Sequence, residues 1–70
     1  MTKIKSFILN NRQYYGNGKF NLFDLICYFD YNLDLLVIEY NNLICDKKEW
    51  NNIFINNHDK IEIVTIVGGG

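Results

Sequence analysis

The chain has 70 residues, of which 49% are hydrophobic, and its formal net charge is −1 at pH 7. This length predicts one domain with a single compact core, which buries only roughly 60% of the surface of the unfolded chain. A charge this close to neutral, with no basic or acidic block, argues against nucleic-acid binding driven by counterion release. The longest apolar runs are far too short to span a membrane.

The first predicted elements form a β-hairpin. Residues 3–9 alternate imperfectly between polar and apolar side chains, which predicts the first strand. Asn10 and Asn11 follow, and asparagine tolerates the left-handed backbone conformation that a tight turn requires. Residues 12–15 are then predicted as a short return strand. Residues 16–19 lack the longer glycine frame and the Ser or Thr of a phosphate-binding P-loop, so this segment is interpreted as a plain loop.

An amphipathic helix is predicted after residue 21. Asn21 can accept hydrogen bonds from the free amides of the first turn, and Asp24, three residues later, can complete a capping box. Apolar residues then recur at spacings of three and four, which predicts a core-facing stripe and a helix that ends near residues 30–32. We interpret this stripe as core rather than as a cofactor site; it consists of Leu22, Leu25, Ile26 and Phe29, flanked by Phe23 and Tyr28.

A second hairpin is predicted in the middle of the chain. Residues 35–40 form a strongly apolar run typical of a central strand, and Asn41 and Asn42 repeat the turn signal of the first hairpin. Residues 43–45 form a short return strand. Alternation places Glu39, the acidic residue of this apolar run, and Glu62, that of the last apolar run, on the solvent side of the sheet.

The connection to the last strand is predicted to close the core. Asp46 is expected to cap one helical turn over residues 47–50. Trp50 in that turn is interpreted as a side chain that closes one edge of the core. Residues 53–55 are a short extended piece, and the polar residues 56–59 turn the chain into its last strand.

The last strand leads into three glycines. Residues 61–67 form a β-branched run, which predicts a strand, and Gly68, Gly69 and Gly70 follow. The four residues from Val67 onward can extend at most ~13 Å, and without Cβ atoms the glycines can pass through a channel only a backbone wide. The predicted organisation is a domain over residues 1–67 with a flexible glycine tail over residues 68–70. A frayed end without function is the alternative.

The order of the elements predicts the fold class. A hairpin, a helix, a strand, a short strand and a terminal strand are expected to form an α+β fold, a mixed sheet with one main helix packed across one face. If the first and last strands pair in parallel at the centre, the fold is a β-grasp. That pairing would bury the last strand and fix the point where the tail leaves the body.

The chain lacks the side chains of a catalyst or a metal site. His58, the one histidine, is interpreted as a surface residue in a polar turn. Cys27 and Cys45 lie in apolar runs without a zinc-binding spacing, so they are expected to be reduced, buried thiols of an intracellular protein. The remaining reactive group is the α-carboxylate of Gly70. Because it is an anion at neutral pH, with a pKa near ~3.5, another enzyme must activate it before acyl chemistry is possible.

The end of the sequence resembles a known family. His58 and Asp59, followed by the run 60–64 and then by Val67 and the glycines, look like the end of the thiamine-biosynthesis sulfur carriers of the ThiS family. The turn at residues 47–50 and the total length agree with that family. The segment 14–18 departs most from it, because aromatic residues and glycines stand where the family is usually acidic and polar.

The resemblance implies a fold and a set of partners. It implies a ubiquitin-like β-grasp carrier without catalytic residues or a bound cofactor. An ATP-dependent adenylating enzyme of the ThiF type would activate Gly70, a sulfur donor system would convert it into a thiocarboxylate, and a thiazole synthase of the ThiG type would consume it. Gly68 and Gly69 would form, with Gly70, the tail that threads into these partners.

Several alternatives stay open at this point. A molybdopterin-type sulfur carrier would share the fold and the tail, and a ubiquitin-like interaction module would have a tail that is never activated. A partner surface that includes Phe54, Val64 and Ile66 is a further hypothesis. The chain is rich in Asn and Ile and lacks Ala and Pro, as expected of an AT-rich genome. The expected location is therefore the plastid stroma if the gene belongs to an organelle, and otherwise the bacterial cytoplasm.

Overall fold

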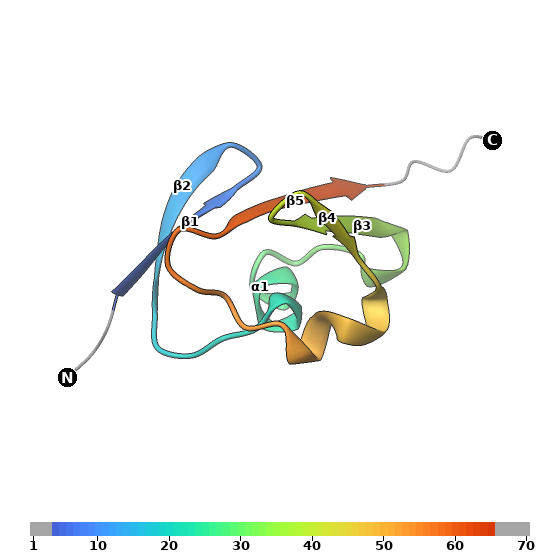
Figure 1. Ribbon diagram of the computed structural model, residues 1–70. Coiled ribbons are helices and arrows are strands. Elements are labelled where there is room, and N and C mark those ends of the chain that lie inside the picture. The colour runs from blue at the N-terminus through green and yellow to red at the C-terminus, as the bar shows by residue number, and fades with distance from the viewer. Residues whose placement is uncertain (1–3, 66–70) are drawn as a thin grey trace.

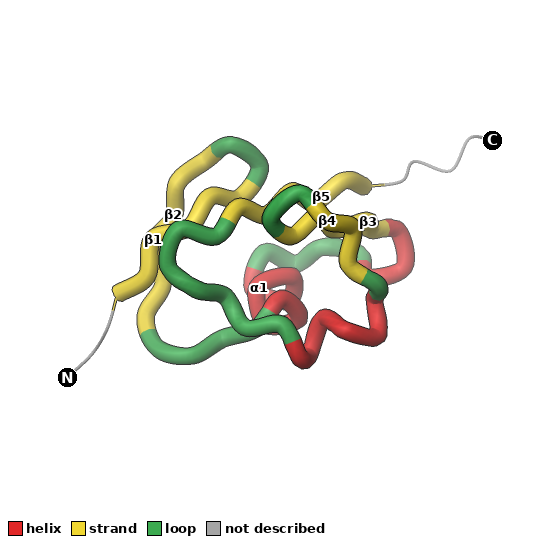
Figure 2. Tube along the Cα trace, in the orientation of Figure 1, coloured by secondary structure: helices red, strands yellow, loops and turns green. Residues whose placement is uncertain are grey.

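The computed structural model of the protein describes residues 4–65. These residues form one sheet in the order β2-β1-β5-β3-β4, with the helix α1 packed on one face (Figure 1; Figure 2). The elements in chain order are β1 (Ile4–Leu9), β2 (Arg12–Asn17), α1 (Leu22–Tyr28), the 3₁₀ helix η1 (Leu33–Leu35), β3 (Leu36–Tyr40), β4 (Leu43–Cys45), the 3₁₀ helix η2 (Lys47–Asn52) and β5 (Lys60–Thr65).

The strand β5 lies at the centre of the sheet. It runs parallel to β1, where Ile8 pairs with Lys60 and Leu9 with Ile61. It runs antiparallel to β3 along its length, from Tyr40 opposite Ile61 to Leu36 opposite Thr65. The two hairpins therefore lie on opposite sides of β5. This arrangement confirms the predicted α+β class, the parallel pairing of the first and last strands of the chain, and the β-grasp fold.

Both hairpin turns adopt the predicted left-handed conformation. Asn10 and Asn11 have φ values of 49° and 65°, and Asn41 and Asn42 have φ values of 51° and 72°. Two consecutive positive φ values match the type I′ turn, whose twist suits a two-residue hairpin. The return strand β2 is two residues longer than predicted. It continues through Gly16 and Asn17 because the ladder with β1 extends to Ile4 opposite Asn17.

The helix α1 begins as predicted and ends earlier. The Asp24 amide donates to the Asn21 Oδ1 (2.8 Å), and the Asn21 amide donates to the Asp24 Oδ2 (3.1 Å), which completes the capping box. The helix ends at Tyr28 instead of near residues 30–32. Asp30 adopts φ 60°, its amide donates to the Cys27 carbonyl, and the Tyr31 amide donates to the Ile26 carbonyl. These two bonds form a Schellman motif, which stops the helix without a glycine.

The core lies between α1 and the sheet, and the loop before β5 closes it. The helix contributes three buried residues to the core, as the stripe predicted. Trp50 is buried, and its Nε1 donates to the Cys45 carbonyl (3.3 Å), so it closes an edge of the core as predicted. The buried apolar residues are Phe7, Leu9, Leu22, Leu25, Ile26, Leu36, Ile38, Trp50, Ile55, Ile61 and Ile63.

Two local predictions are wrong. Asp46 precedes η2, but its side chain forms no capping hydrogen bond and lies 3.7 Å from the Lys48 Nζ instead. The turn is held by the backbone, because the Glu49 amide donates to the Asp46 carbonyl. Cys27 is exposed, since it lies on the side of α1 opposite the apolar stripe. Cys45 is half-buried, and this burial raises the pKa of its thiol.

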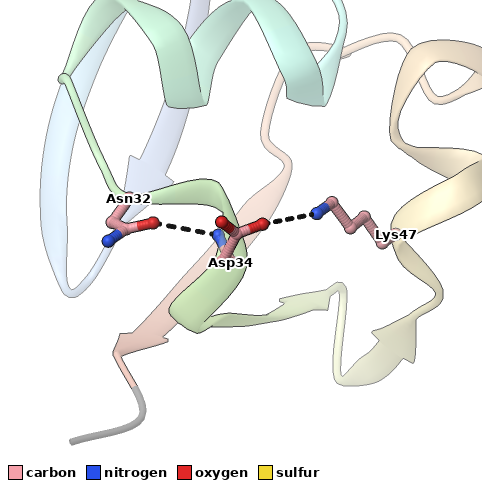
Figure 3. A network of polar contacts seen from close by, with 3 residues as sticks. All are labelled: Asn32, Asp34 and Lys47. Carbon is pink, nitrogen blue, oxygen red and sulfur yellow. Dashed lines mark hydrogen bonds and ion pairs between the residues drawn. The ribbon is translucent and has the colours of Figure 1, made fainter.

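A small polar network on the surface links η1 to the start of η2 (Figure 3). The Asn32 Oδ1 accepts a hydrogen bond from the Asp34 amide (3.1 Å), and the Asp34 carboxylate lies 3.3 Å from the Lys47 Nζ (Figure 3). Both charged side chains are mostly exposed to water. The ion pair therefore contributes at most about 1 kcal/mol to the free energy of unfolding.

Candidate functional site

The predicted reactive tail follows the central strand. The structure describes β5 as far as Thr65, which pairs with Leu36 at the beginning of β3. The last two residues of the predicted strand, Ile66 and Val67, lie outside the described residues. So do Gly68, Gly69 and Gly70, whose roles as tail and as modified residue stay predictions.

β5 extends past its parallel neighbour. Its ladder with β1 stops at Ile61, whereas its ladder with β3 continues to Thr65. Beyond Ile61, the β1 side of the strand meets the first hairpin turn, where the Ile63 amide donates to the Asn10 Oδ1 (2.7 Å). The described end of β5 is therefore held by β3 on one side and, at Ile63, by one asparagine side chain on the other.

The second hairpin turn holds the start of β5. The Lys60 amide donates to the Asn41 Oδ1 (2.8 Å), and the Asn41 amide donates to the Lys60 carbonyl (2.7 Å). The left-handed conformation of Asn41 therefore serves both the turn and the contact with β5. Each hairpin thus contributes one asparagine, Asn10 or Asn41, whose side chain binds the backbone of the central strand.

A buried carboxylate fixes the turn that leads into β5. Asp59 is 7% exposed. Its carboxylate accepts hydrogen bonds from the Tyr40 hydroxyl (2.5 Å), the Asn56 amide (2.7 Å) and the Asn41 Nδ2 (3.1 Å). Burial, and next the hydrogen bond to Asp59, raise the pKa of Tyr40 to about 12. The phenol therefore remains a hydrogen-bond donor at neutral pH.

The sheet face opposite α1 carries a mixed apolar and acidic surface, which we call the open face. On it, Val37 lies opposite Val64 and Glu39 lies opposite Glu62. Both glutamates are half-buried, so alternation predicted their side of the sheet correctly. The Lys60 Nζ lies 3.8 Å from the Glu62 carboxylate and offsets part of the repulsion between the two glutamates.

The structure separates two members of the hypothesised partner surface. Val64 is 53% exposed and lies on the open face. Phe54 is 42% exposed but belongs to the layer of α1, because its strand-like bridge is to Asn21 and its ring faces the Lys19 ammonium group at 5.5 Å. Ile66, the third member, lies outside the described residues. Val64 and Phe54 therefore do not form one patch.

The roles of Asn10, Asn41 and Asp59 were missed by the sequence analysis. The two asparagines were identified as turn residues, but the backbone amides that donate to their side chains lie on β5 and reach them only through the parallel placement of that strand. The position of Asp59 two residues before the predicted last strand was a signal that could have been used. His58 is exposed with φ 71°, so its assignment to a surface turn is confirmed.

Two other kinds of feature would point to a function among residues 4–65, a metal site and a membrane-spanning helix. Between residues 4 and 65, no group of three or more His, Cys, Asp and Glu side chains is arranged to hold a metal ion. None of the helices described in this range has the length and apolarity needed to cross a membrane.

Comparison with known proteins gives a family and a fold. The chain is similar to the ycf40 protein of Trieres chinensis, with 60% identity over 73 residues and complete coverage of both chains. It is 34% identical to the ycf40 protein of Porphyra purpurea over 65 residues, which cover 93% of this chain and 92% of that protein.

Solved structures with little sequence similarity share the fold. The crystal structure of the thiamine biosynthesis protein ThiS from Geobacter metallireducens superposes with a TM-score of 0.80 at 16% identity, covering 93% of this chain and 99% of that one. The solution structure of the Geobacter metallireducens protein gives a TM-score of 0.76. The sequence model of the ThiS family matches residues 8–70, so the chain belongs to the ThiS family.

Proposed function

We propose that the protein is a sulfur carrier for thiamine biosynthesis and that Gly70 is the residue that carries the sulfur. The observation that supports this most directly is the match of the ThiS family to residues 8–70, which includes the three final glycines. The β-grasp body adds a physical reason. β5 lies between two hairpins and is held by Asn10 and Asn41, so the described strand that precedes the glycines in the sequence has a fixed place in the body.

The proposed chemistry takes place at the α-carboxylate and is performed by other proteins. An adenylating enzyme of the ThiF type joins a Gly70 carboxylate oxygen to the α-phosphate of ATP and releases pyrophosphate. A donor system then supplies sulfur at the oxidation level of sulfide, which forms a C–S bond at the same carbon while the C–O bond to AMP breaks and AMP leaves. The resulting thiocarboxylate passes its sulfur to a thiazole synthase of the ThiG type. The carrier itself contributes recognition and position, and it is a protein co-substrate rather than an enzyme.

An intact-mass experiment tests this proposal. The protein is incubated with a cognate adenylating enzyme, ATP and a sulfur source, and its mass is expected to rise by the difference between one sulfur and one oxygen atom. A variant without Gly70 is the matched control, because it keeps residues 4–65 and so should fold normally. The proposal is refuted if an enzyme that activates another carrier in the same assay leaves this protein unchanged.

A complementation experiment separates the two possible pathways. Expression in a thiamine auxotroph that lacks its own carrier is expected to restore growth, whereas expression in a molybdenum-cofactor mutant is not. Restoration of the second mutant alone would favour the molybdopterin-type carrier. A non-activated interaction module would differ from both, because deletion of Gly70 would leave its binding unchanged.

We also propose that the protein works in the plastid stroma. The similarity to proteins named ycf40 supports an organelle-encoded gene, because such names are given to plastid reading frames. The asparagine- and isoleucine-rich composition agrees with that source. Fractionation of plastids with an antibody against the protein tests this proposal, and enrichment in another compartment would refute it.

A further inference from the structure

A groove of about 470 Å³ lies between β2 and α1, on the side of the sheet away from the open face. Phe7 and Leu25, both buried, belong to its lining. The rings of Tyr14 and Phe29 meet edge to face, 5.3 Å apart, and Tyr28 contacts Phe29 in the same way at 5.1 Å. The groove has the size and the aromatic lining of a site that receives apolar groups.

Tyr28 is the most exposed aromatic residue of this groove. Tyr28 is 82% exposed, although it stands only two residues after the buried Ile26. Among the residues that line the groove, Asp24 is the one with a charge. One carboxylate oxygen of Asp24 accepts the capping bond from Asn21, and the carboxylate as a whole remains exposed. The groove is therefore apolar with a negative charge at the α1 side.

The strand that borders the groove is an edge of the sheet. β1 pairs with one side of β2, and within residues 4–65 no strand pairs with the other side. In a two-residue hairpin the pair beside the turn, here Leu9 and Arg12, is hydrogen-bonded, and such pairs then alternate along the ladder. The amide and carbonyl groups of Gln13, Tyr15 and Asn17 therefore point along the open edge.

This edge lacks the features that usually protect an edge strand. Proteins protect exposed edges with charged side chains, proline, bulges or a covering segment. After Arg12, β2 has no charged residue and no proline, and its register with β1 is continuous to Asn17. The free backbone groups are therefore accessible beside an apolar groove, which is the combination that strand addition uses.

We propose that β2 and α1 form a docking site for an extended peptide segment of a partner protein. The segment adds to the sheet as a strand beside β2, so that its backbone bonds to the outward groups of Gln13, Tyr15 and Asn17. Every second side chain of the segment then enters the groove, where apolar residues are favoured. A lysine or arginine of the segment lies near Asp24. An extended main chain is the occupant that satisfies both the edge and the groove.

This site differs from the proposed sulfur-carrying tail in place and in chemistry. Its residues belong to β2 and α1, whereas the tail follows β5. Deletion of Gly70 is therefore expected to abolish sulfur transfer and to leave peptide binding unchanged. Failure of one proposal is thus distinguishable from failure of the other.

Peptide selection followed by NMR tests the inference. A display library of random peptides is selected on the full-length protein, and synthetic copies of the enriched peptides are titrated into isotope-labelled protein. The enriched peptides are expected to have alternating apolar residues and a basic residue, and to shift the amide signals of residues 13–17 and of α1. The inference is overturned if no peptide is enriched, or if the shifts lie on the open face.

Point variants distinguish the edge from the groove. Tyr28→Ser removes an exposed ring of the groove, and Tyr15→Pro removes an outward amide of β2 where an edge strand tolerates proline. Each variant is expected to weaken peptide binding by at least about tenfold. The unfolding temperature of each variant shows whether it still folds. If Tyr15→Pro fails to fold, Tyr28→Ser still decides, because its side chain is mostly in water.

The other edge of the sheet provides matched controls. Leu43→Ser and Ile44→Pro on β4 change residues that are 73% and 74% exposed and should leave peptide binding unchanged. Equal losses at both edges would refute a site at β2. Sedimentation of the free protein adds a last check, because a dimer that disappears in the Tyr15→Pro variant would identify a second copy, not a partner peptide, as the occupant.

Discussion

The hydrogen bonds of Asp59 lead to a prediction about stability. Its carboxylate accepts from the Tyr40 hydroxyl, the Asn56 amide and the Asn41 Nδ2. Asp59→Ala removes this acceptor at a buried position, so three hydrogen-bond donors lose their partner. A hydrogen bond to a charged group contributes about 1.5–3 kcal/mol. Since water reaches part of this site, we count the two shorter bonds only and expect a loss of about 3 kcal/mol in the free energy of unfolding.

Urea unfolding at neutral pH, followed by circular dichroism, measures this loss. Asp34→Ala is the matched control, because it removes an exposed carboxylate with one ion pair and should cost less than about 1 kcal/mol. The slope of the free energy against urea should stay the same in both variants, since neither changes the surface exposed on unfolding by much. If Asp59→Ala and Asp34→Ala lose the same amount, the assigned role of Asp59 is wrong.

Three further predictions concern the same turns and the helix. Asn10→Gly keeps the left-handed conformation but removes the acceptor of the Ile63 amide, so its free energy of unfolding in urea should fall by about 1 kcal/mol. Asn11→Gly is the control and should be nearly neutral. Equal effects of the two variants would contradict the assigned contact. The pKa of Tyr40 is raised from 10.0 to about 12 in the folded state, so the contribution of this shift to stability is complete below pH 10 and is lost as the pH rises toward 12. Tyr40→Phe should remove that part of the pH dependence of the free energy of unfolding. An unchanged pH profile in this variant would contradict the assigned shift. Asp30→Gly should raise the free energy of unfolding by about 0.5–1 kcal/mol, because Asp30 ends α1 at φ 60°, where glycine is less strained. A lower unfolding temperature of this variant would contradict that reasoning.

The features that were predicted correctly depend on residues close together in the sequence. The two asparagine turns need only two consecutive residues with positive φ, and the capping box of Asn21 and Asp24 needs only a spacing of three. The apolar stripe of α1 is also local. Cys27 could have been placed correctly by the same periodicity, but it was judged from its apolar neighbours in the sequence instead of from its side of the helix.

The features that were missed depend on contacts between distant segments. Asn10 and Ile63 are 53 residues apart, and Asn41 and Lys60 are 19 apart. Their hydrogen bonds exist only because β5 enters between the hairpins, which no local pattern specifies. The groove between β2 and α1 likewise forms only when segments distant in the sequence come together. Gly16 lies under the Phe20 ring, where an added Cβ would be 2.5 Å from the nearest ring atom, and sequence alone did not reveal that contact.

The central position of β5 has a consequence for biosynthesis. The ribosome releases both hairpins and α1 before it releases Lys60–Thr65, yet neither hairpin has a neighbour in the sheet until that strand arrives. A nascent or truncated chain that ends before residue 60 therefore cannot assemble the sheet. Completion of the fold therefore waits until residues 60–65 have left the ribosome, so a chain that stops before them should be unfolded and open to proteases.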